Sequence, residues 1–450
     1  MRYLPLTNTD RATMLETVGV RSIKELFAEI PASARLDEPL DGLPTRKSEM
    51  EVARVLSRMA ASNVTAGDGP FFIGAGAYRH HIPATVDHLI QRSEFLTAYT
   101  PYQPELSQGT LQYLFEFQTQ IALITGMEVA NASMYDGSTG CAEAVLMAGR
   151  ITKRNKAVLS GGLHAHYRQA VQNVCRFARF DVRALPPSLG AEADITTSID
   201  KETACVLVQT PNVYGAPIDL EPIARAAHDK GALLIAVVTE AVSLGAVRSP
   251  GAMGADIVAA EGQSLGVGLN FGGPHLGLFA TREAFMRHMP GRLVGETVDR
   301  DAKRGYVLTL STREQHIRRE RAKSNICTNS GSCALAFTIH MSLLGEKGFR
   351  DLARLNHHNA CRLTDRLTAV AGVELMTPVF FNELTIKTPK SGAAVVEALA
   401  ARGILAGVPV SRLEPQAKAF ETLITLATTE LNTQDDMEAC AQGLDEVLRQ

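Results

Sequence analysis

The sequence lacks a strong excess of charge of either sign, and it lacks any long apolar run. Its 450 residues carry a formal net charge of −3, so no global basic field would draw it to nucleic acid or to an anionic membrane. No apolar stretch has membrane-spanning length, and residues 1–10 lack the apolar segment of a secretory signal. These absences predict a cytoplasmic protein that binds neither nucleic acid nor membrane.

Paired cysteines are missing as well. The seven cysteines are scattered along the chain without a C-x-x-C pair, which is typical of free thiols in a reducing compartment rather than of a disulfide framework. His164 and His166 form an H-x-H pair, but no carboxylate or cysteine joins them in a recognised ligand pattern. The sequence therefore predicts no metal site.

What is present is an ordinary globular composition, with 45% hydrophobic and 21% charged residues, in a chain long enough for about two to three domains. Residues 1–70 are expected to form an N-terminal helical arm, because Ser22-Ile-Lys-Glu25 and Ser48-Glu-Met-Glu51 each form a capping-box pattern before apolar residues. So few helices make a poor core by themselves, so the arm is expected to pack on something else.

From residue 71 to residue 325, short apolar runs alternate with helical stretches. Strand–helix alternation produces parallel strands with helices on both faces, and strands buried on both faces are apolar without alternation, so this region predicts a large α/β domain. Residues 326–450 show a long helical stretch and then further strands, which predicts a smaller C-terminal α+β domain. The expected strands are Ala157–Leu159, Cys205–Gln209, Leu233–Val238, Ile257–Ala259 and Gly277–Ala280 in the first domain, and Glu383–Lys387, Gly407–Pro409 and Leu423–Ala427 in the second.

One further absence lies in Gly254–Ala280, which has an apolar strand, a loop, a glycine-rich turn and a second apolar strand. In α/β enzymes that use pyridoxal phosphate (PLP), such a loop carries the lysine that holds the aldehyde as a Schiff base. No lysine occurs between Lys230 and Lys303. A chain that is built like a PLP enzyme without this amine should not be catalytic alone.

Two other stretches could serve a cofactor. Asp136-Gly-Ser-Thr-Gly140 precedes a helix, where small residues and hydroxyls can cradle a phosphate, although a plain capped turn explains it equally well. His164 follows an expected strand, at the edge where parallel sheets bind ligands. It could stack on a cofactor ring or relay protons, or it could be a loop histidine bonded to a backbone carbonyl.

Three polar segments leave their roles open. Tyr99–Gly109 combines hydrogen-bonding side chains with two prolines that stiffen it, which suits a binding loop, an interface or a rigid connector. Phe71–His81 resembles a glycine loop but does not match a dinucleotide motif. Thr312–Lys323 is rich in cations, which fits a solvated helix face with a Glu314–Arg318 pair or a docking site for an acidic partner or anion.

In this order, these pieces closely resemble one family, the P-protein of the glycine cleavage system (glycine dehydrogenase, decarboxylating). Within it they resemble the first, alpha subunit of organisms that split the enzyme into two chains. The resemblance runs from Met1 to near the C-terminus and is looser after about Val370. The stretches that carry it are FIGAGAYRHHIPATVDHLIQRSEFLTAYTPYQPELSQGTLQ (Phe72–Gln112), TGMEVANASMYDGSTGCAEA (Thr125–Ala144), VQTPNVYGAPIDL (Val208–Leu220), GADIVAAEGQSLGVGLNFGGPHLG (Gly254–Gly277) and TREQHIRRERAKSNICTN (Thr312–Asn329).

The resemblance implies the aspartate-aminotransferase-like fold of PLP-dependent transferases (fold type I) and an α₂β₂ heterotetramer with glycine dehydrogenase subunit 2 (beta). In that assembly only the partner subunit carries the Schiff-base lysine and holds PLP. The complex decarboxylates glycine and passes the aminomethyl group to the lipoyl group of H-protein. In this chain Gln263 stands at the lysine position, counted back from the shared turn Gly272–Pro274, and glutamine cannot form an aldimine.

The resemblance also implies a relic of a cofactor site. The aspartate that usually faces the pyridine nitrogen is absent after the strand Leu233–Val238. Ser138, Thr139 and His164 are then expected to be vestiges of a site that binds no cofactor covalently. No catalytic residue is assigned to this chain, and Tyr99, Tyr102 and Gln103 form the loop that is the candidate to complete the partner's pocket.

Three alternatives stay open at this point. The chain could be a stand-alone PLP-dependent aminotransferase or desulfurase that uses Lys303 or Lys323, with Cys327 as a desulfurase nucleophile in place of a small buried hydrophobe. It could be a scaffolding subunit that contributes no side chain to catalysis. It could also be a regulatory protein that has left the complex.

Overall fold

The computed structural model describes residues 5–36, 40–44, 46–96, 100–190 and 193–450. The chain forms two compact units, Met1–Val64 and Thr65–Gln450. None of the helices in the described ranges combines the length and the apolar character needed to cross a membrane.

In the described part of the first unit, two short 3-10 turns lie between two α-helices. The elements are α1 (Asn8–Val18), η1 (Ile23–Phe27), η2 (Ala32–Ala34) and α2 (Glu49–Ala60). Capping boxes begin both α-helices, at Thr7 and at the predicted Ser48. The box expected at Ser22 is wrong, because the Ser22 side chain makes no cap bond and only a 3-10 turn follows it.

The second unit is built on a seven-stranded sheet. Its strands are β1 (Val129–Ala130), β2 (Lys156–Leu159), β3 (Asp181–Ala184), β4 (Thr203–Gln209), β5 (Leu233–Val238), β6 (Ile257–Glu261) and β7 (Gly277–Thr281). Their order is β1-β7-β6-β5-β4-β2-β3, with parallel neighbours from β6 to β3 and antiparallel pairing of β7 with β6 and of β1 with β7. The predicted mostly parallel sheet is confirmed.

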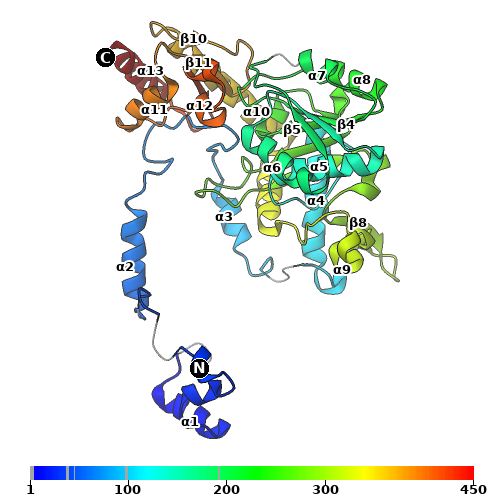
Figure 1. The fold of residues 1–450 in the computed structure, drawn as a ribbon, viewed down its shortest axis with the longest axis vertical. Coiled ribbons are helices and arrows are strands. Elements are labelled where there is room, and N and C mark those ends of the chain that lie inside the picture. The colour runs from blue at the N-terminus through cyan, green and yellow to red at the C-terminus, as the bar shows by residue number, and fades with distance from the viewer. Residues whose placement is uncertain (1–4, 37–39, 45, 97–99, 191–192) are drawn as a thin grey trace. The chain divides into compact units, whose positions relative to one another are not determined.

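Helices cover both faces of this sheet. Successive residues of a strand point to opposite sides, so strands that are apolar throughout have two faces to bury. The helices of this unit are α3 (Ala84–Ile90), α4 (Gln108–Thr125), α5 (Gly137–Thr152), α6 (Ala165–Phe177), α7 (Ala193–Thr197), α8 (Glu221–Asp229), α9 (Gln315–Arg318), α10 (Gly331–Thr368), α11 (Gly392–Ala400), α12 (Val410–Leu413) and α13 (Gln434–Arg449). Leu234 and Ala236 of β5 belong to a core shared with α4, α8 and α10. Ile235 and Val237 belong to a core shared with α5 and α6, which lie side by side in Figure 1.

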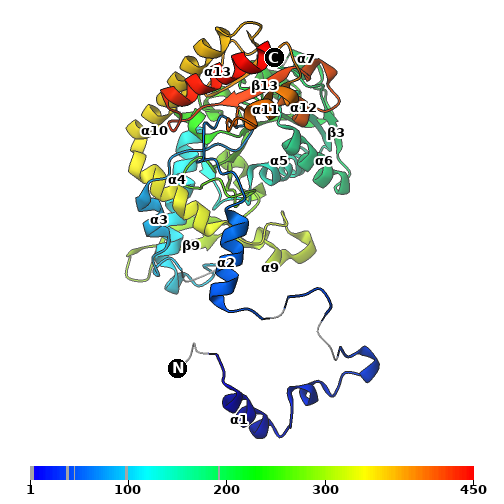
Figure 2. The same ribbon diagram turned by 90° about the vertical axis from the view of Figure 1, so that its left-hand side faces the viewer.

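A smaller antiparallel sheet follows near the C-terminus. Its strands are β10 (Glu374–Leu375), β11 (Glu383–Lys387), β12 (Val408–Pro409) and β13 (Leu423–Ala427), in the order β10-β11-β13-β12. It shares a core with α10, α11 and α13, and Figure 2 shows α10 running from this sheet along the rest of the unit. A separate hairpin pairs β8 (Leu293–Val298) with β9 (Arg304–Thr309). The domain limits expected after residues 70 and 325 stay predictions.

The strands predicted from apolar runs are all present, three of them with the predicted bounds. The runs did not predict β1, which is only two residues long. They also did not predict β3, where Asp181 and Arg183 are exposed at the sheet edge. An edge strand that alternates polar and apolar residues lacks the continuous apolar run of its buried neighbours.

Candidate functional site

Polar side chains line the carboxyl edge of the parallel strands, where sheets of this kind bind ligands. His164 follows β2, Gln209 ends β4, Glu240 follows β5 and Gln263 follows β6, and all four are buried. The His164 N–H donates to Gln209 Oε1 at 2.9 Å. The edge is therefore polar and enclosed, so the element that encloses it decides what it can bind.

Residues 72–81, called the filling segment below, lie against this edge. Gln263 holds the segment in both directions, because its Oε1 accepts from the Tyr78 N–H at 2.9 Å and its Nε2 donates to the Tyr78 carbonyl at 3.0 Å. The same Nε2 donates to the Val267 carbonyl at 2.9 Å. Gln263 is 2% exposed. The hydrogen bonds of its side-chain amide are all made to backbone groups of its own chain.

His164 contacts the same segment. Its Nδ1 accepts from the His166 N–H at 3.1 Å, so Nε2 carries the proton and donates to the Ala75 carbonyl at 2.8 Å. Burial lowers the pKa of His164 to about 4, so the ring is neutral. A Cβ added to Gly76, whose φ is 95°, would stand 3.4 Å from His164 Cδ2. The filling segment thus packs directly on the imidazole that was expected to face a cofactor ring.

The start of α5 holds two carboxylates of the chain itself. Asp136 Oδ1 accepts from the N–H groups of Ser138 and Thr139 at 2.8 and 2.9 Å, and the Asp136 carboxylate also accepts from both hydroxyls at 2.6 and 2.8 Å. Glu261 Oε2 accepts from the Gly137 N–H at 3.0 Å. The donors that could cradle a phosphate are therefore already bonded to side chains.

Glu261 connects this helix start to the loop of Gln263. Its Oε1 accepts from the Gln263 N–H at 3.0 Å and from the Leu276 N–H at 2.8 Å. Burial raises the pKa of Glu261 to about 7, although the backbone hydrogen bonds from Leu276 and Gly137 oppose this change. The buried Glu261 carboxyl group therefore accepts hydrogen bonds from three backbone segments at this edge, those of Gly137, Gln263 and Leu276.

We expect Asp136→Ala to lower the free energy of unfolding by about 1–2 kcal/mol, because it removes the N-cap acceptor of α5. Asp136→Asn keeps an oxygen that can accept from the Ser138 and Thr139 N–H groups, and it should lose much less. Denaturant unfolding of the parent chain and both variants measures the difference. Equal losses for the two substitutions would contradict the capping role.

His80 of the filling segment is a buried bridge between two carboxylates. Its Nε2 lies 3.0 Å from Glu240 Oε2, and its Nδ1 lies 2.9 Å from Glu430 Oε2. Burial disfavours the charged ring, but the attraction and hydrogen bonds of Glu240 and then Glu430 outweigh it and raise the pKa of His80 to about 10. Glu240, which follows β5 where a pyridine partner is expected in PLP enzymes, is thus engaged by the chain itself.

Glu383 of β11 ties the filling segment to the smaller sheet. Its Oε1 accepts from the Ala75 N–H at 2.6 Å, and its Oε2 accepts from the Tyr78 hydroxyl at 2.9 Å. Burial raises the pKa of Glu383 to about 7. Tyr78 is therefore held at its backbone by Gln263 and at its hydroxyl by Glu383.

These residues do not fit PLP. The cofactor needs an amine for its aldehyde, donors for its phosphate and a partner for its pyridine nitrogen. Gln263 offers an amide, the donors of α5 are bonded to Asp136 and Glu261, and Glu240 is paired with His80. Backbone and carboxylate groups of the chain take the positions that the cofactor would need.

The loop expected to complete a partner's pocket lies at the surface. Tyr99 lies outside the described residues. Tyr102 is 51% exposed, and its hydroxyl accepts from Arg292 Nη2 at 2.9 Å. Gln103 is exposed as well and precedes the 3-10 turn η3 (Pro104–Leu106).

The cationic stretch after β9 is not a solvated helix face. It consists of the 3-10 turns η7 (Ser311–Arg313) and η8 (Arg319–Arg321) around the single turn α9. The expected Glu314–Arg318 pair is wrong, because Glu314 is buried against Arg292 with Nε–Oε2 at 3.1 Å. Arg318 Nε donates instead to the Thr312 carbonyl at 3.0 Å.

The lysines of the stand-alone alternative lie outside the loop of Gln263. Lys303 is in the turn between β8 and β9, where its N–H donates to Asp299 Oδ1 at 2.9 Å. Lys323 follows η8, and its N–H donates to the Arg313 carbonyl at 3.0 Å. Cys327 is exposed, which differs from the buried position expected for a small hydrophobe.

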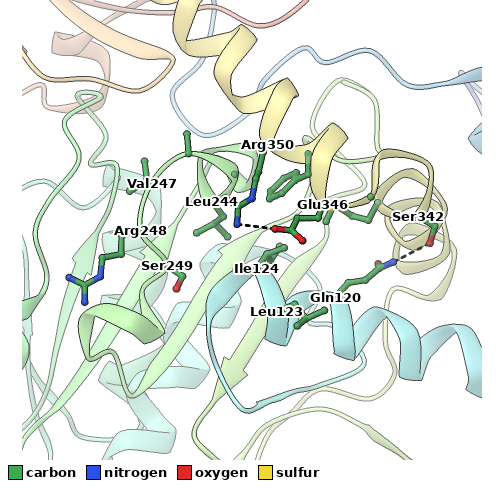
Figure 3. A pocket seen from close by; sticks show the side chains of 15 residues that line it. Gln120, Leu123, Ile124, Leu244, Val247, Arg248, Ser249, Ser342, Glu346 and Arg350 are labelled. Atoms are coloured by element: carbon green, nitrogen blue, oxygen red, sulfur yellow. Dashed lines mark hydrogen bonds and ion pairs between the residues drawn. The ribbon is translucent and has the colours of Figure 1, made fainter.

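A hollow of about 890 Å³ lies between α4, α10 and the 3-10 turn η4 (Ala241–Gly245). Figure 3 shows Glu346 and Arg350 paired there, at 3.0 Å, and Gln120 donating to the Ser342 hydroxyl at 3.2 Å. Glu346 is the only carboxylate among the described lining residues, and it is already paired. The hollow therefore lacks a free acid–base group, and its lining includes none of the edge residues described above.

The whole chain matches proteins of one kind. Residues 1–444 match the family model of the glycine cleavage system P-protein. The chain belongs to the glycine cleavage system P-protein family. Two relatives described as "Probable glycine dehydrogenase (decarboxylating) subunit 1" are each 64% identical, over 449 residues in Rhodospirillum centenum and 448 residues in Xanthobacter autotrophicus, and 100% of both chains is covered in each case.

Solved structures place this P-protein chain in its fold class. A crystal structure of glycine decarboxylase (P-protein) of the glycine cleavage system, in inhibitor-bound form, aligns with a TM-score of 0.90 and 44% identity over 100% of both chains. Glutamate decarboxylase of Lactobacillus brevis aligns with a TM-score of 0.68 over 93% of this chain and 98% of that chain, at 12% identity, which is a likeness of fold alone. The predicted fold type I of PLP-dependent enzymes is confirmed.

Several residues of the P-protein chain that shape the edge are absent from the sequence prediction. Glu261 and Glu383 could have been found, because a carboxylate within an apolar, buried strand must be hydrogen-bonded. His80 could not, since Glu240 and Glu430 lie 160 and 350 residues away in the sequence. In the sequence, the stretch Phe71–His81 that contains His80 resembles only a glycine loop.

Proposed function

We propose that this chain is the subunit of the P-protein that does not carry PLP. With glycine dehydrogenase subunit 2 it catalyses the decarboxylation of glycine and the transfer of the aminomethyl group to the lipoyl group of H-protein. The single observation that carries the proposal is Gln263, which occupies the lysine position with its amide bonded to backbone, in a chain that is similar to subunit 1 over its full length. The enzyme is glycine dehydrogenase (aminomethyl-transferring), of which this chain is a subunit.

The N-terminal unit supports the need for a partner. Val52, Leu56 and Met59 of α2 are 43%, 58% and 61% exposed and form an apolar stripe with the half-buried Val55. An amphipathic helix gains most of its stability by packing such a stripe on another surface. We propose that α2 packs on subunit 2 in an α₂β₂ heterotetramer, and the free cysteines support a reducing compartment, the cytoplasm.

The filled edge supports a proposed division of roles between the two subunits. Subunit 2 supplies the lysine and the PLP, because this chain offers neither an amine nor free phosphate donors at the corresponding place. This chain supplies the loop of Tyr102 and Gln103, whose exposed side chains border the partner's pocket and help to exclude water from it. A purely scaffolding subunit, which is the second candidate, would supply no such side chains.

The proposal is tested by treating the chain alone, and then the two-subunit complex, with PLP and borohydride. Mass spectrometry should find no phosphopyridoxyl-lysine in this chain and one stoichiometric adduct in subunit 2. A stoichiometric adduct at one specific lysine of this chain would overturn the proposal and restore the stand-alone PLP enzyme. Failure to co-purify with subunit 2 would instead identify a regulatory protein outside the complex.

We expect Tyr102→Ala or Gln103→Ala to reduce glycine turnover by the reconstituted complex by about tenfold or more, because a misplaced binding group weakens substrate positioning. Assembly with subunit 2 should stay close to that of the parent chain. Steady-state turnover and size-exclusion chromatography measure the two effects. Phe177→Ala is the matched control, because Phe177 is an exposed aromatic at the end of α6. Normal turnover with both loop variants would favour the scaffolding subunit.

A further inference from the structure

Arg292 is almost fully buried, and each of its guanidinium nitrogens has a partner. Its exposed fraction is 2%. Nε donates to Glu314 Oε2 at 3.1 Å, Nη1 donates to the Thr328 hydroxyl at 2.6 Å, and Nη2 donates to the Tyr102 hydroxyl at 2.9 Å. A second Nη1 contact, at 3.5 Å, reaches the Thr100 hydroxyl. One residue therefore joins the surface loop of Tyr102 to the segment that follows β9.

The Tyr102 ring is held from two sides. The Arg292 guanidinium carbon lies 5.0 Å from the ring centroid, within the range of a cation–π contact. The His316 ring packs edge-on against Tyr102, with centroids 5.3 Å apart. The backbone under Arg292 is fixed as well, because its carbonyl accepts from the Ala132 N–H at 2.9 Å. A half-exposed tyrosine on a loop is thus held by one hydrogen bond and two ring contacts.

The hydrogen bond between Arg292 and Tyr102 determines which of the two groups is the donor. A guanidinium can only donate, so the Tyr102 oxygen is the acceptor in the bond with Arg292. The Tyr102 O–H is then left to donate to another group, and within the described residues the structure assigns it no acceptor. The Tyr102 residue as a whole is half-exposed, and its hydroxyl proton is therefore left for an acceptor from outside the described residues.

We infer that Arg292 is a positioning residue, which fixes Tyr102 so that its hydroxyl donates to the carboxylate of glycine bound in the partner subunit's pocket. The inference rests on the proposed function, in which this loop borders that pocket. Glycine carries an amino group, which PLP held by subunit 2 would engage, and a carboxylate. The carboxylate is thus the acceptor that the substrate can offer to a phenolic O–H.

An arginine is needed for this geometry. Its planar guanidinium donates in several directions at once, whereas a lysine ammonium is a compact donor on a flexible stem. Arg292→Lys keeps a positive charge beside Glu314, so the buried carboxylate stays compensated. It cannot reach Glu314, Thr328 and Tyr102 together in the same plane, so the Tyr102 hydroxyl loses its fixed direction.

The test uses the complete two-subunit enzyme with Tyr102→Phe, Arg292→Lys and the double variant. A hydrogen bond to a charged group contributes enough binding energy that Tyr102→Phe should raise the KM for glycine by about tenfold. The kcat should change by less than about twofold. Arg292→Lys should raise KM in the same way, and the double variant should be no worse than Tyr102→Phe, because both changes remove one interaction.

Arg313→Lys is the matched control. Arg313 is also buried, and it donates to the Met289 and Gly291 carbonyls rather than to Tyr102. It should leave the KM for glycine unchanged. An unchanged KM in Tyr102→Phe, additive effects in the double variant, or an equal rise in Arg313→Lys would overturn the inference. If the unmodified chain and subunit 2 did not assemble, or did not turn over glycine together, the proposed function itself would be overturned. Failure of the inference and failure of the proposed function therefore give different results.

Discussion

Gln263→Lys will not give this chain a lysine-bound PLP, and it will lower the free energy of unfolding by about 3–5 kcal/mol. A lysine at this position cannot accept from the Tyr78 N–H, which now bonds to Gln263 Oε1. It also brings an ammonium group into a place that is 2% exposed. The substitution therefore removes the acceptor of the Tyr78 N–H and places an ammonium group at a buried position.

The cofactor would still be excluded after this change. The donors at the start of α5 are bonded to Asp136 and Glu261, and the filling segment packs on His164. Restoring the amine restores only one of the three features that PLP requires. A lysine at position 263 is thus not expected to be sufficient for a Schiff base with PLP in this chain.

Borohydride reduction with PLP, followed by mass spectrometry, checks the first part of this prediction, and denaturant unfolding checks the second. Gln442→Lys is the control, because Gln442 is exposed on α13 and the same change should leave stability nearly unaltered. A stoichiometric adduct at position 263, in a variant as stable as its parent, would show that the edge can still open for a cofactor.

His80→Gln is expected to lower the free energy of unfolding by roughly 3–5 kcal/mol near neutral pH, because it leaves two buried carboxylates without their shared counter-charge. The imidazole bonds Glu240 at 3.0 Å and Glu430 at 2.9 Å. Glutamine can donate to one of these groups, but it carries no charge. The ties between the filling segment, the large sheet and the loop after β13 should therefore weaken together.

The loss should depend on pH in a defined direction. The pKa of His80 is raised to about 10 in the folded chain, from an ordinary value of 6.5. The folded state holds this proton more tightly than the unfolded state, so the contribution of His80 is complete below pH 6.5 and is lost as the pH rises through about 10. The difference in stability between the parent chain and His80→Gln should therefore shrink toward pH 10.

Thermal unfolding between about pH 8 and pH 10 measures this effect free of the carboxyl groups Glu261 and Glu383, because their pKa values are raised only to about 7. His81→Gln is the matched control, because His81 is the exposed neighbour, and its curve should follow the parent. Parallel curves for the parent and His80→Gln across this range would show that His80 is not charged in the folded chain.

The agreement between sequence and structure is best where the signal is local. Leu233–Val238 is apolar at every position and forms the central β5, because a strand covered on both faces must be apolar throughout. Ser48 and Glu51 satisfy each other across one helical turn, so four adjacent residues suffice to predict the start of α2. The same pattern failed at Ser22, since a capping box needs a following helix, and only a 3-10 turn follows there.

The agreement is poorest where a charge has a distant partner. The spacing of Glu314 and Arg318 suggests a helical pair, yet Arg292, 22 residues earlier, takes the carboxylate in the buried interior. Burial strengthens the attraction between Arg292 and Glu314, because an ion pair that is out of water is screened much less than one on an exposed helix face. Sequence spacing contains no information on which of two arginines will be buried.

The continuous apolar strands, the family and the absence of an amine at Gln263 were all predictable from the sequence alone, because each depends on residue identity or on short-range periodicity. The tertiary structure alone decided that the edge is filled by the chain itself. Bonds from the filling segment to Gln263, Glu383 and Glu430 span 185, 305 and 350 residues. Such contacts form only when the chain has folded, and they place backbone and carboxylate groups of the chain itself at the edge where Gln263 stands in the lysine position.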